Sequence, residues 1–155
     1  MTLRLAVLWI HVSFGALWIG GSASFALAAA VLEKGGAERR EFAIRAALPI
    51  NRLNIVAAIV VILSGIANIY FAGRLRNYDF APAFTHLLEA KIGIYILMVL
   101  ALAGSLGAEF RLSRAYTKDN FGAVSVSANR LAKLYVFTAI MGVIALALGL
   151  WLAGS

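Results

Sequence analysis

The chain has 155 residues, of which 63% are hydrophobic and 14% are charged, whereas an ordinary soluble domain carries roughly 25% charged residues. Basic residues outnumber acidic residues by 14 to 7. They lie between long apolar runs without forming a basic and aromatic face, so a nucleic-acid partner is not expected. Cysteine is absent, which excludes disulfides, thiolate metal ligands and the covalent attachment of a c-type haem.

Four apolar segments each approach the roughly 20 residues that cross the hydrocarbon of a bilayer. They cover residues 3–32, 50–72, 86–107 and 131–153. The first exceeds the roughly 7–15 apolar residues of a signal peptide, so we expect it to remain as a span. None alternates in polarity as a membrane barrel strand would. The sequence therefore predicts an all-α integral membrane protein, a four-transmembrane-helix bundle in a single domain over residues 1–155.

The first segment carries His11 within the run VLWIHVSFGALWIGG. An ionisable side chain in a membrane span usually faces the bundle interior, a cavity or a cofactor. A neutral imidazole can ligate haem iron, copper or zinc, or it can hydrogen-bond a neighbouring helix. Gly15, one turn further on, leaves room for a flat macrocycle. Small residues also recur at intervals of four, a pattern typical of close helix packing, at Ala16, Gly20, Ser24 and Ala28.

Further polar residues end the second segment, at Asn68, and open the third, at His86, Glu89 and Lys91. His86 is either a solvated residue at a helix start or a second ligand. His86 and Glu89 share a helix face because they are three residues apart, whereas Lys91 lies about 200° around the helix from Glu89. Lys91 therefore needs a partner of its own. It could ligate iron, pair with a cofactor carboxylate such as a haem propionate, or extend to the outer surface.

The loop charges predict the topology. The first and third connections hold ten basic residues, Lys34, Arg39, Arg40, Arg45, Arg52, Arg111, Arg114, Lys118, Arg130 and Lys133. The remaining connection and the N-terminus hold three, Arg4, Arg74 and Arg76. By the positive-inside rule, the first and third connections are cytoplasmic and both termini lie on the outer, periplasmic side of the inner membrane.

This orientation places the polar residues in depth. His11, Asn68, Glu89 and Lys91 gather in the outer third of the bilayer, with His86 at its surface. Trp9 and Trp151 fall in the outer aromatic belt. The polar residues at the cytoplasmic ends of the spans are interpreted as interfacial anchors, namely Asn51, Arg52, Asn54, Asn129, Arg130 and Lys133.

Short motifs in three segments resemble those of one group of membrane proteins. The first segment reads H-x3-G-x2-W-x-G-G, from His11, Gly15, Trp18, Gly20 and Gly21. The second reads N-R-L and later S-G, from Asn51, Arg52, Leu53, Ser64 and Gly65, and the third carries Lys91 in LLEAKIGIYILM. In these motifs the chain resembles the CopD-like and HemJ-like small membrane proteins.

The resemblance implies a bundle of four or five helices. HemJ-like members are protoporphyrinogen oxidases associated with haem b, in which His11 would correspond to the ligand and Lys91 to an essential site residue. CopD-like members are linked to copper uptake. The chain departs from both, because its fourth segment ends simply in ALALGLWLAGS and its three methionines are scattered.

Three hypotheses follow from these residues. In the first, the protein binds haem b and serves electron transfer or the oxidation of a porphyrinogen or quinol. His11 is then an axial ligand, Lys91 or His86 is the sixth ligand or propionate partner, and the cofactor site includes Trp18, Gly15, Asn68 and Glu89. In the second, His11 and His86 carry copper or a small molecule across the membrane. In the third, the protein is a non-catalytic assembly or sensor subunit. Four helices are few to enclose a macrocycle. A homodimer is therefore a further expectation of the haem hypothesis.

Overall fold

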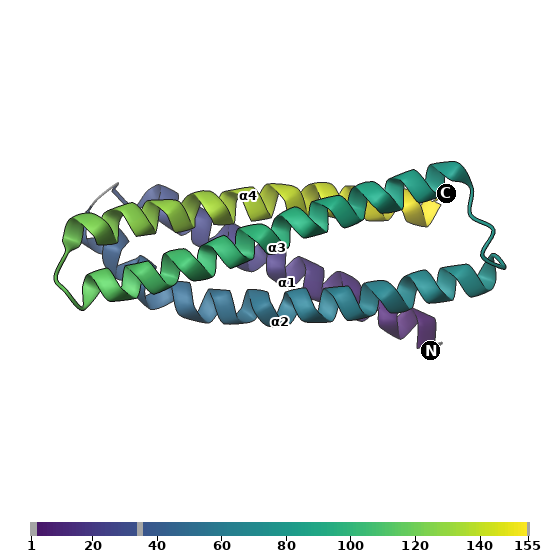
Figure 1. Cartoon of the computed structure of the whole chain (residues 1–155), viewed down its shortest axis with the longest axis horizontal. Coiled ribbons are helices and arrows are strands. Elements are labelled where there is room, and N and C mark those ends of the chain that lie inside the picture. The colour runs from purple at the N-terminus through teal and green to yellow at the C-terminus, as the bar shows by residue number, and fades with distance from the viewer. Residues whose placement is uncertain (1–2, 34–35, 155) are drawn as a thin grey trace.

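Four helices form the bundle in the computed structural model, which describes residues 3–33 and 36–154, with side chains as far as Trp151 (Figure 1). Helix α1 spans Leu3–Val31, α2 spans Ala37–Leu75, α3 spans Pro82–Tyr116 and α4 spans Phe121–Gly154. The predicted all-α, four-helix architecture is confirmed, and each helix is long and apolar enough to cross a membrane. Lys34 and the side chain of the last predicted span residue, Ala153, lie outside the described residues.

Successive helices run in opposite directions. Both termini and the 76–81 connection therefore lie at one end of the bundle, here called the terminal end (Figure 1). The 32–36 and 117–120 connections lie at the other end, here called the basic end. Helices α1 and α3 each pack against α2 and α4. Toward the terminal end, the α1–α2 hairpin and the α3–α4 hairpin separate from each other in Figure 1.

The helices continue past the apolar segments at the basic end. Helix α2 passes through Pro49, although an interior proline typically costs a helix about 3 kcal/mol. The helix is nevertheless packed before the proline, where Ala43 and Ala47 are each 1% exposed. Helix α4 begins where the Oδ1 of Asn120 accepts the N–H of Ala123 at 3.0 Å, a favourable N-cap. The basic connections are therefore much shorter than the apolar pattern suggests.

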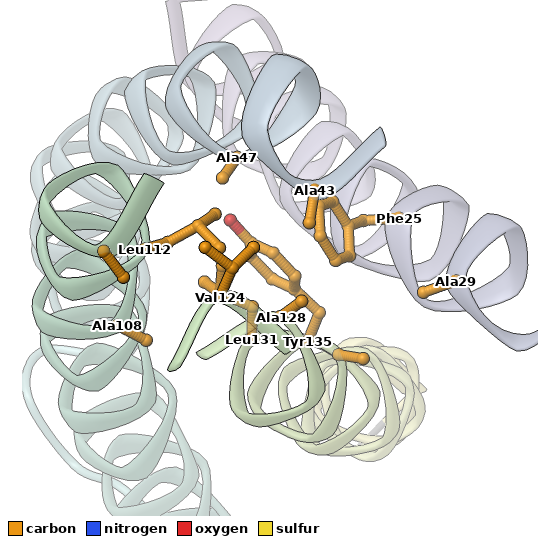
Figure 2. Packing of buried hydrophobic residues seen from close by; sticks show 12 residues of the cluster. Phe25, Ala29, Ala43, Ala47, Ala108, Leu112, Val124, Ala128, Leu131 and Tyr135 are labelled. Atoms are coloured by element: carbon orange, nitrogen blue, oxygen red, sulfur yellow. The ribbon is translucent and has the colours of Figure 1, made fainter. Parts of the chain in front are cut away.

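A hydrophobic core at the basic end explains these extensions. The Phe25 ring of α1 packs against Tyr135 of α4, with ring centroids 4.5 Å apart. Leu112 of α3 and Val124 and Leu131 of α4 complete the cluster, each at most 1% exposed. Figure 2 shows the Tyr135 ring at the centre of this packing, with its hydroxyl group directed toward Ala47 on α2. All four helices are therefore tied together at this end.

A second cluster fills the middle of the bundle around Trp18, which is 1% exposed. Its indole meets the ring of Tyr95 edge-on, at 5.8 Å between centroids. Met98 and Leu102 of α3 are buried beside it. The described residues form no third hydrophobic cluster between this one and the terminal end. Hydrophobic clustering is therefore concentrated in the middle and at the basic end of the bundle.

The prediction that a row of small residues packs α1 against its neighbours was wrong. Ala16, Gly20 and Ser24 are exposed, whereas the buried residues of α1 are Trp18, Ser22, Phe25 and Ala29. Large side chains fill the space between α1 and its neighbours, so this helix does not need a row of small residues. Helices α1 and α4 instead approach closely at Gly142 of α4, where a Cβ atom would collide with the side chain of Ile19.

Candidate functional site

His11 continues the inward-facing row of α1 toward the terminal end. Positions 11, 15, 18, 22, 25 and 29 recur in steps of four and three, which keeps them on one face of a helix. Positions 18, 22, 25 and 29 of this row are buried. His11 itself is half-buried. The histidine therefore faces the other helices, as predicted for an ionisable residue in an apolar helix.

Helix α2 fixes the His11 ring. Its Nδ1 lies 3.1 Å from the carbonyl oxygen of Val61 and 3.0 Å from the Oγ of Ser64. Because a carbonyl oxygen can only accept, Nδ1 carries the proton in this arrangement. The Ser64 hydroxyl donates to the Val60 carbonyl at 2.5 Å, which leaves its oxygen to accept from Nδ1. In the neutral ring, Nε2 then has its lone pair available.

This arrangement is typical of a metal-ligating histidine, which usually donates its other ring N–H to a backbone carbonyl or a carboxylate. No second hydrogen bond engages the His11 ring through Nε2 within the described part of the chain. Opposite the ring lies Gly65, where a Cβ atom would be 3.3 Å from the Cε1 of His11. Helix α2 thus provides both the acceptor that orients the ring and the room for it.

Lys91 lies on the inward-facing side of α3, one turn from Tyr95 and two from the buried Met98. It is half-buried, and its Nζ rests against Gly149 of α4, where a Cβ atom would lie only 2.8 Å away. Among residues 3–33 and 36–154, no carboxylate forms an ion pair with it and no acceptor forms a hydrogen bond with it. Helices α1 and α3 both begin at the terminal end. The structure therefore brings these two predicted site residues to the same end of the bundle.

Three other predicted residues lie on α1 and α2, the helices that position the His11 ring. Asn68 is half-buried on α2, one turn from Ser64. Gly15 lies one turn from His11, and a Cβ atom there would meet nothing within 4 Å. Trp18 is buried in the middle of the bundle, and its Nε1 has no hydrogen-bond partner in the described structure. Gly15 and Asn68 thus lie near the His11 level, whereas Trp18 closes the interior beneath it.

His86 and Glu89 are placed differently. The Nδ1 of His86 lies 3.5 Å from the Oε2 of Glu89, and the two side chains are 79% and 67% exposed. They therefore lie on the surface of α3, and the structure does not bring them into the interior with His11. The described residues also contain no group of three or more histidine or acidic side chains able to hold a metal ion. A metal bound by His11 would need most of its ligands from a cofactor.

The sequence interpretation missed a buried polar network centred on Asn51. The Asn51 Nδ2 donates to Glu109 Oε2 at 2.6 Å, and its Oδ1 accepts from the hydroxyls of Ser105 and Tyr135 at 2.7 and 2.8 Å. Asn51 is 1% exposed, so its interpretation as an interfacial anchor was wrong. Instead, it connects α2 to both α3 and α4.

Asn54 was misinterpreted for the same reason. It is 1% exposed and donates from Nδ2 to the Ser22 Oγ at 3.3 Å. One signal could have revealed both asparagines. Positions 47, 51, 54 and 58 recur in steps of four and three, so they share a helix face with two buried alanines.

The candidate site is thus an imidazole oriented by a backbone carbonyl and an ammonium group that has no counter-ion among the described residues. Both groups lie beyond the hydrophobic middle of the bundle, toward the terminal end. Such a pair can supply one ligand nitrogen and one positive charge. Comparison of the chain with protein-family models, with curated proteins and with solved structures finds no match.

Proposed function

We propose that this chain is an integral membrane protein that binds haem b through His11 and takes part in a redox reaction. The observation that carries the proposal is the His11 ring, whose Nδ1 proton is held by the Val61 carbonyl. Its Nε2 lone pair is left for a metal. Because the chain has no cysteine, a haem could not be attached through thioether bonds and would be of the b type.

The residues present fit a haem in their chemistry. Imidazole nitrogen is a common axial ligand of haem iron, and the Lys91 ammonium, which pairs with none of the described residues, suits a propionate carboxylate. Two surface hollows lie away from this pair, one beside Trp9 on α1 and one beside Tyr116 at the basic end.

Each residue then has a distinct role. His11 supplies the ligand nitrogen, while the Val61 carbonyl and the Ser64 hydroxyl hold the ring in one orientation. Lys91 would bind a carboxylate of the porphyrin or of the substrate. Haem, when bound, supplies the electron-transfer chemistry. The resemblance to the HemJ-like proteins supports a porphyrinogen or a quinol as the electron donor, and the CopD-like alternative of copper transport gains no further ligand from the geometry.

Haem binding can be tested on the purified protein from haem-replete cells. We expect a Soret band that shifts on reduction, and extraction of non-covalent haem b as its pyridine complex. Titration of the haem-free protein with haem should restore the same spectrum. Absence of a Soret band, together with no spectral change on titration, would contradict the proposal. Copper bound in place of haem would favour the transport alternative.

We also propose that the helices cross the inner membrane with both termini outside. Two features support this orientation. Most of the described arginine and lysine residues lie on the helices that flank the 32–36 and 117–120 connections, toward the basic end, which the positive-inside rule assigns to the cytoplasm. At the terminal end, Trp9 and Trp151 are 61% and 68% exposed, as expected for an aromatic belt at the outer interface.

The absence of cysteine makes the orientation simple to test. Asp79 and Thr117 are exposed residues in connections at opposite ends of the bundle. A membrane-impermeant maleimide applied to intact cells should label the Asp79→Cys variant and leave the Thr117→Cys variant unlabelled. Both variants should react after the cells are lysed. Labelling of Thr117→Cys alone in intact cells would reverse the proposed orientation.

A further inference from the structure

Glycine faces each of the two site residues from the neighbouring helix. Gly65 of α2 lies opposite the His11 ring, and Gly149 of α4 lies opposite the Lys91 ammonium. The second contact is the tighter. A Cβ atom at position 149 would lie 2.8 Å from Nζ and 3.7 Å from Cε of Lys91, and real Cβ atoms essentially never approach another heavy atom to less than 3.0 Å. The observed position of the ammonium therefore requires glycine at position 149.

We propose that Gly149 is a positioning residue that holds open the place of the Lys91 ammonium inside the bundle, where it binds a ligand carboxylate. The proposal rests on the proposed function in one respect, since the carboxylate is taken to be a porphyrin propionate. Lys91 has no counter-ion or hydrogen-bond acceptor among the described residues. A half-buried ammonium without a partner is costly, so an anionic ligand at this position would be strongly favoured.

Gly149 acts on the position of Lys91 with little effect on the fold. The atom that a new Cβ would displace is the end of a flexible four-carbon side chain, so the clash can be relieved by rotating the lysine. Alanine is also a better helix former than glycine. The Gly149→Ala variant is thus expected to keep its thermal stability while the Lys91 ammonium shifts away from its place against α4. If Gly149 served only helix packing, Gly149→Ala would instead lower the thermal stability and leave the position of Lys91 unchanged.

The first test uses the haem-free protein and reads the lysine directly. Reductive methylation by formaldehyde and cyanoborohydride, followed by mass spectrometry of the peptides, reports the reactivity of each amine. Relative to Lys118, which is exposed, the methylation rate of Lys91 should differ several-fold between Gly149→Ala and the wild type because the amine is displaced from its place against α4. Gly93→Ala is the matched control, since a Cβ atom there would meet nothing within 4 Å. An unchanged Lys91 rate in Gly149→Ala would overturn the proposal.

The second test compares haem with its dimethyl ester, which has no free carboxylate. We expect the wild type and Gly93→Ala to bind haem about tenfold more tightly than the ester, as one charge-assisted hydrogen bond would allow. Gly149→Ala and Lys91→Met should lose that preference while keeping the spectrum of a His11-ligated haem. Retention of the wild-type preference in Gly149→Ala would also overturn the proposal. If the wild type binds neither porphyrin, haem binding fails as a function, and the methylation rates alone decide the role of Gly149.

Discussion

Replacement of His11 by alanine is expected to abolish the Soret band of the protein without unfolding it. The variant removes the only imidazole that faces the interior in the described structure, since His86 is 79% exposed. Its structural cost is small. Ser64 keeps its hydrogen bond to the Val60 carbonyl, so the loss is that of a single hydrogen-bonded group, about 0.5–1.5 kcal/mol. Optical spectra and thermal unfolding in detergent measure the two effects separately.

Companion variants identify the role of the ring. His86→Ala should keep the wild-type spectrum because His86 pairs with Glu89 on the surface. Ser64→Ala removes one of the two groups that orient the imidazole, and loss of such a partner typically weakens metal binding 10- to 100-fold. Because the Val61 carbonyl remains, we expect Ser64→Ala to weaken haem binding by about tenfold, near the lower limit of this range. Added imidazole should partly restore the spectrum of His11→Ala. If the Soret band survived in His11→Ala and was lost in His86→Ala, His86 and not His11 would be the haem ligand.

The polar residues within the apolar runs were the most predictable part of this protein. His11 and Lys91 stand out in the sequence because an ionisable group deep in an apolar helix requires a partner. Their common location follows from the antiparallel helices, which bring the start of α1 and the start of α3 to the same end. The atomic arrangement could not be predicted. Which ring nitrogen is free depends on the contact of position 11 with positions 61 and 64 of α2, and hydropathy carries no information about such register.

Asn51 and Asn54 show where the sequence interpretation failed. Each lies at the start of the second apolar segment and close to Arg52, which is exposed, so an interfacial position was the natural interpretation. Their burial results from the continuation of α2 to Ala37 and from the core that this extension forms with α3 and α4. Residues 37–49 are too polar for a hydropathy pattern to reveal. The relevant signal is instead the helical spacing of their alanines, which places one face toward the neighbouring helices.

Replacement of Asn51 by leucine is expected to cause the largest loss of stability of any single substitution considered for this protein, with about 1–3 kcal/mol for each buried group left without its hydrogen-bond partner. Leucine is similar in size but cannot donate to Glu109 or accept from Tyr135. The Tyr135 hydroxyl then stays buried without its acceptor, whereas Ser105 can still donate to the Leu102 carbonyl. Thermal or denaturant unfolding in detergent measures the change.

The matched control for this variant is Arg52→Leu, which introduces the same side chain at the next position, where the native residue is exposed. A surface substitution of that kind usually changes stability by no more than about 0.5 kcal/mol. The contribution of the Tyr135 contact can be isolated by a double-mutant cycle, because Tyr135→Phe removes only the hydroxyl that donates to Asn51. If the network is a unit, Tyr135→Phe should cost much less in the Asn51→Leu background than in the wild type. Additive effects, or equal losses in Asn51→Leu and Arg52→Leu, would show that the hydrogen bonds of Asn51 do not hold α2 to α3 and α4.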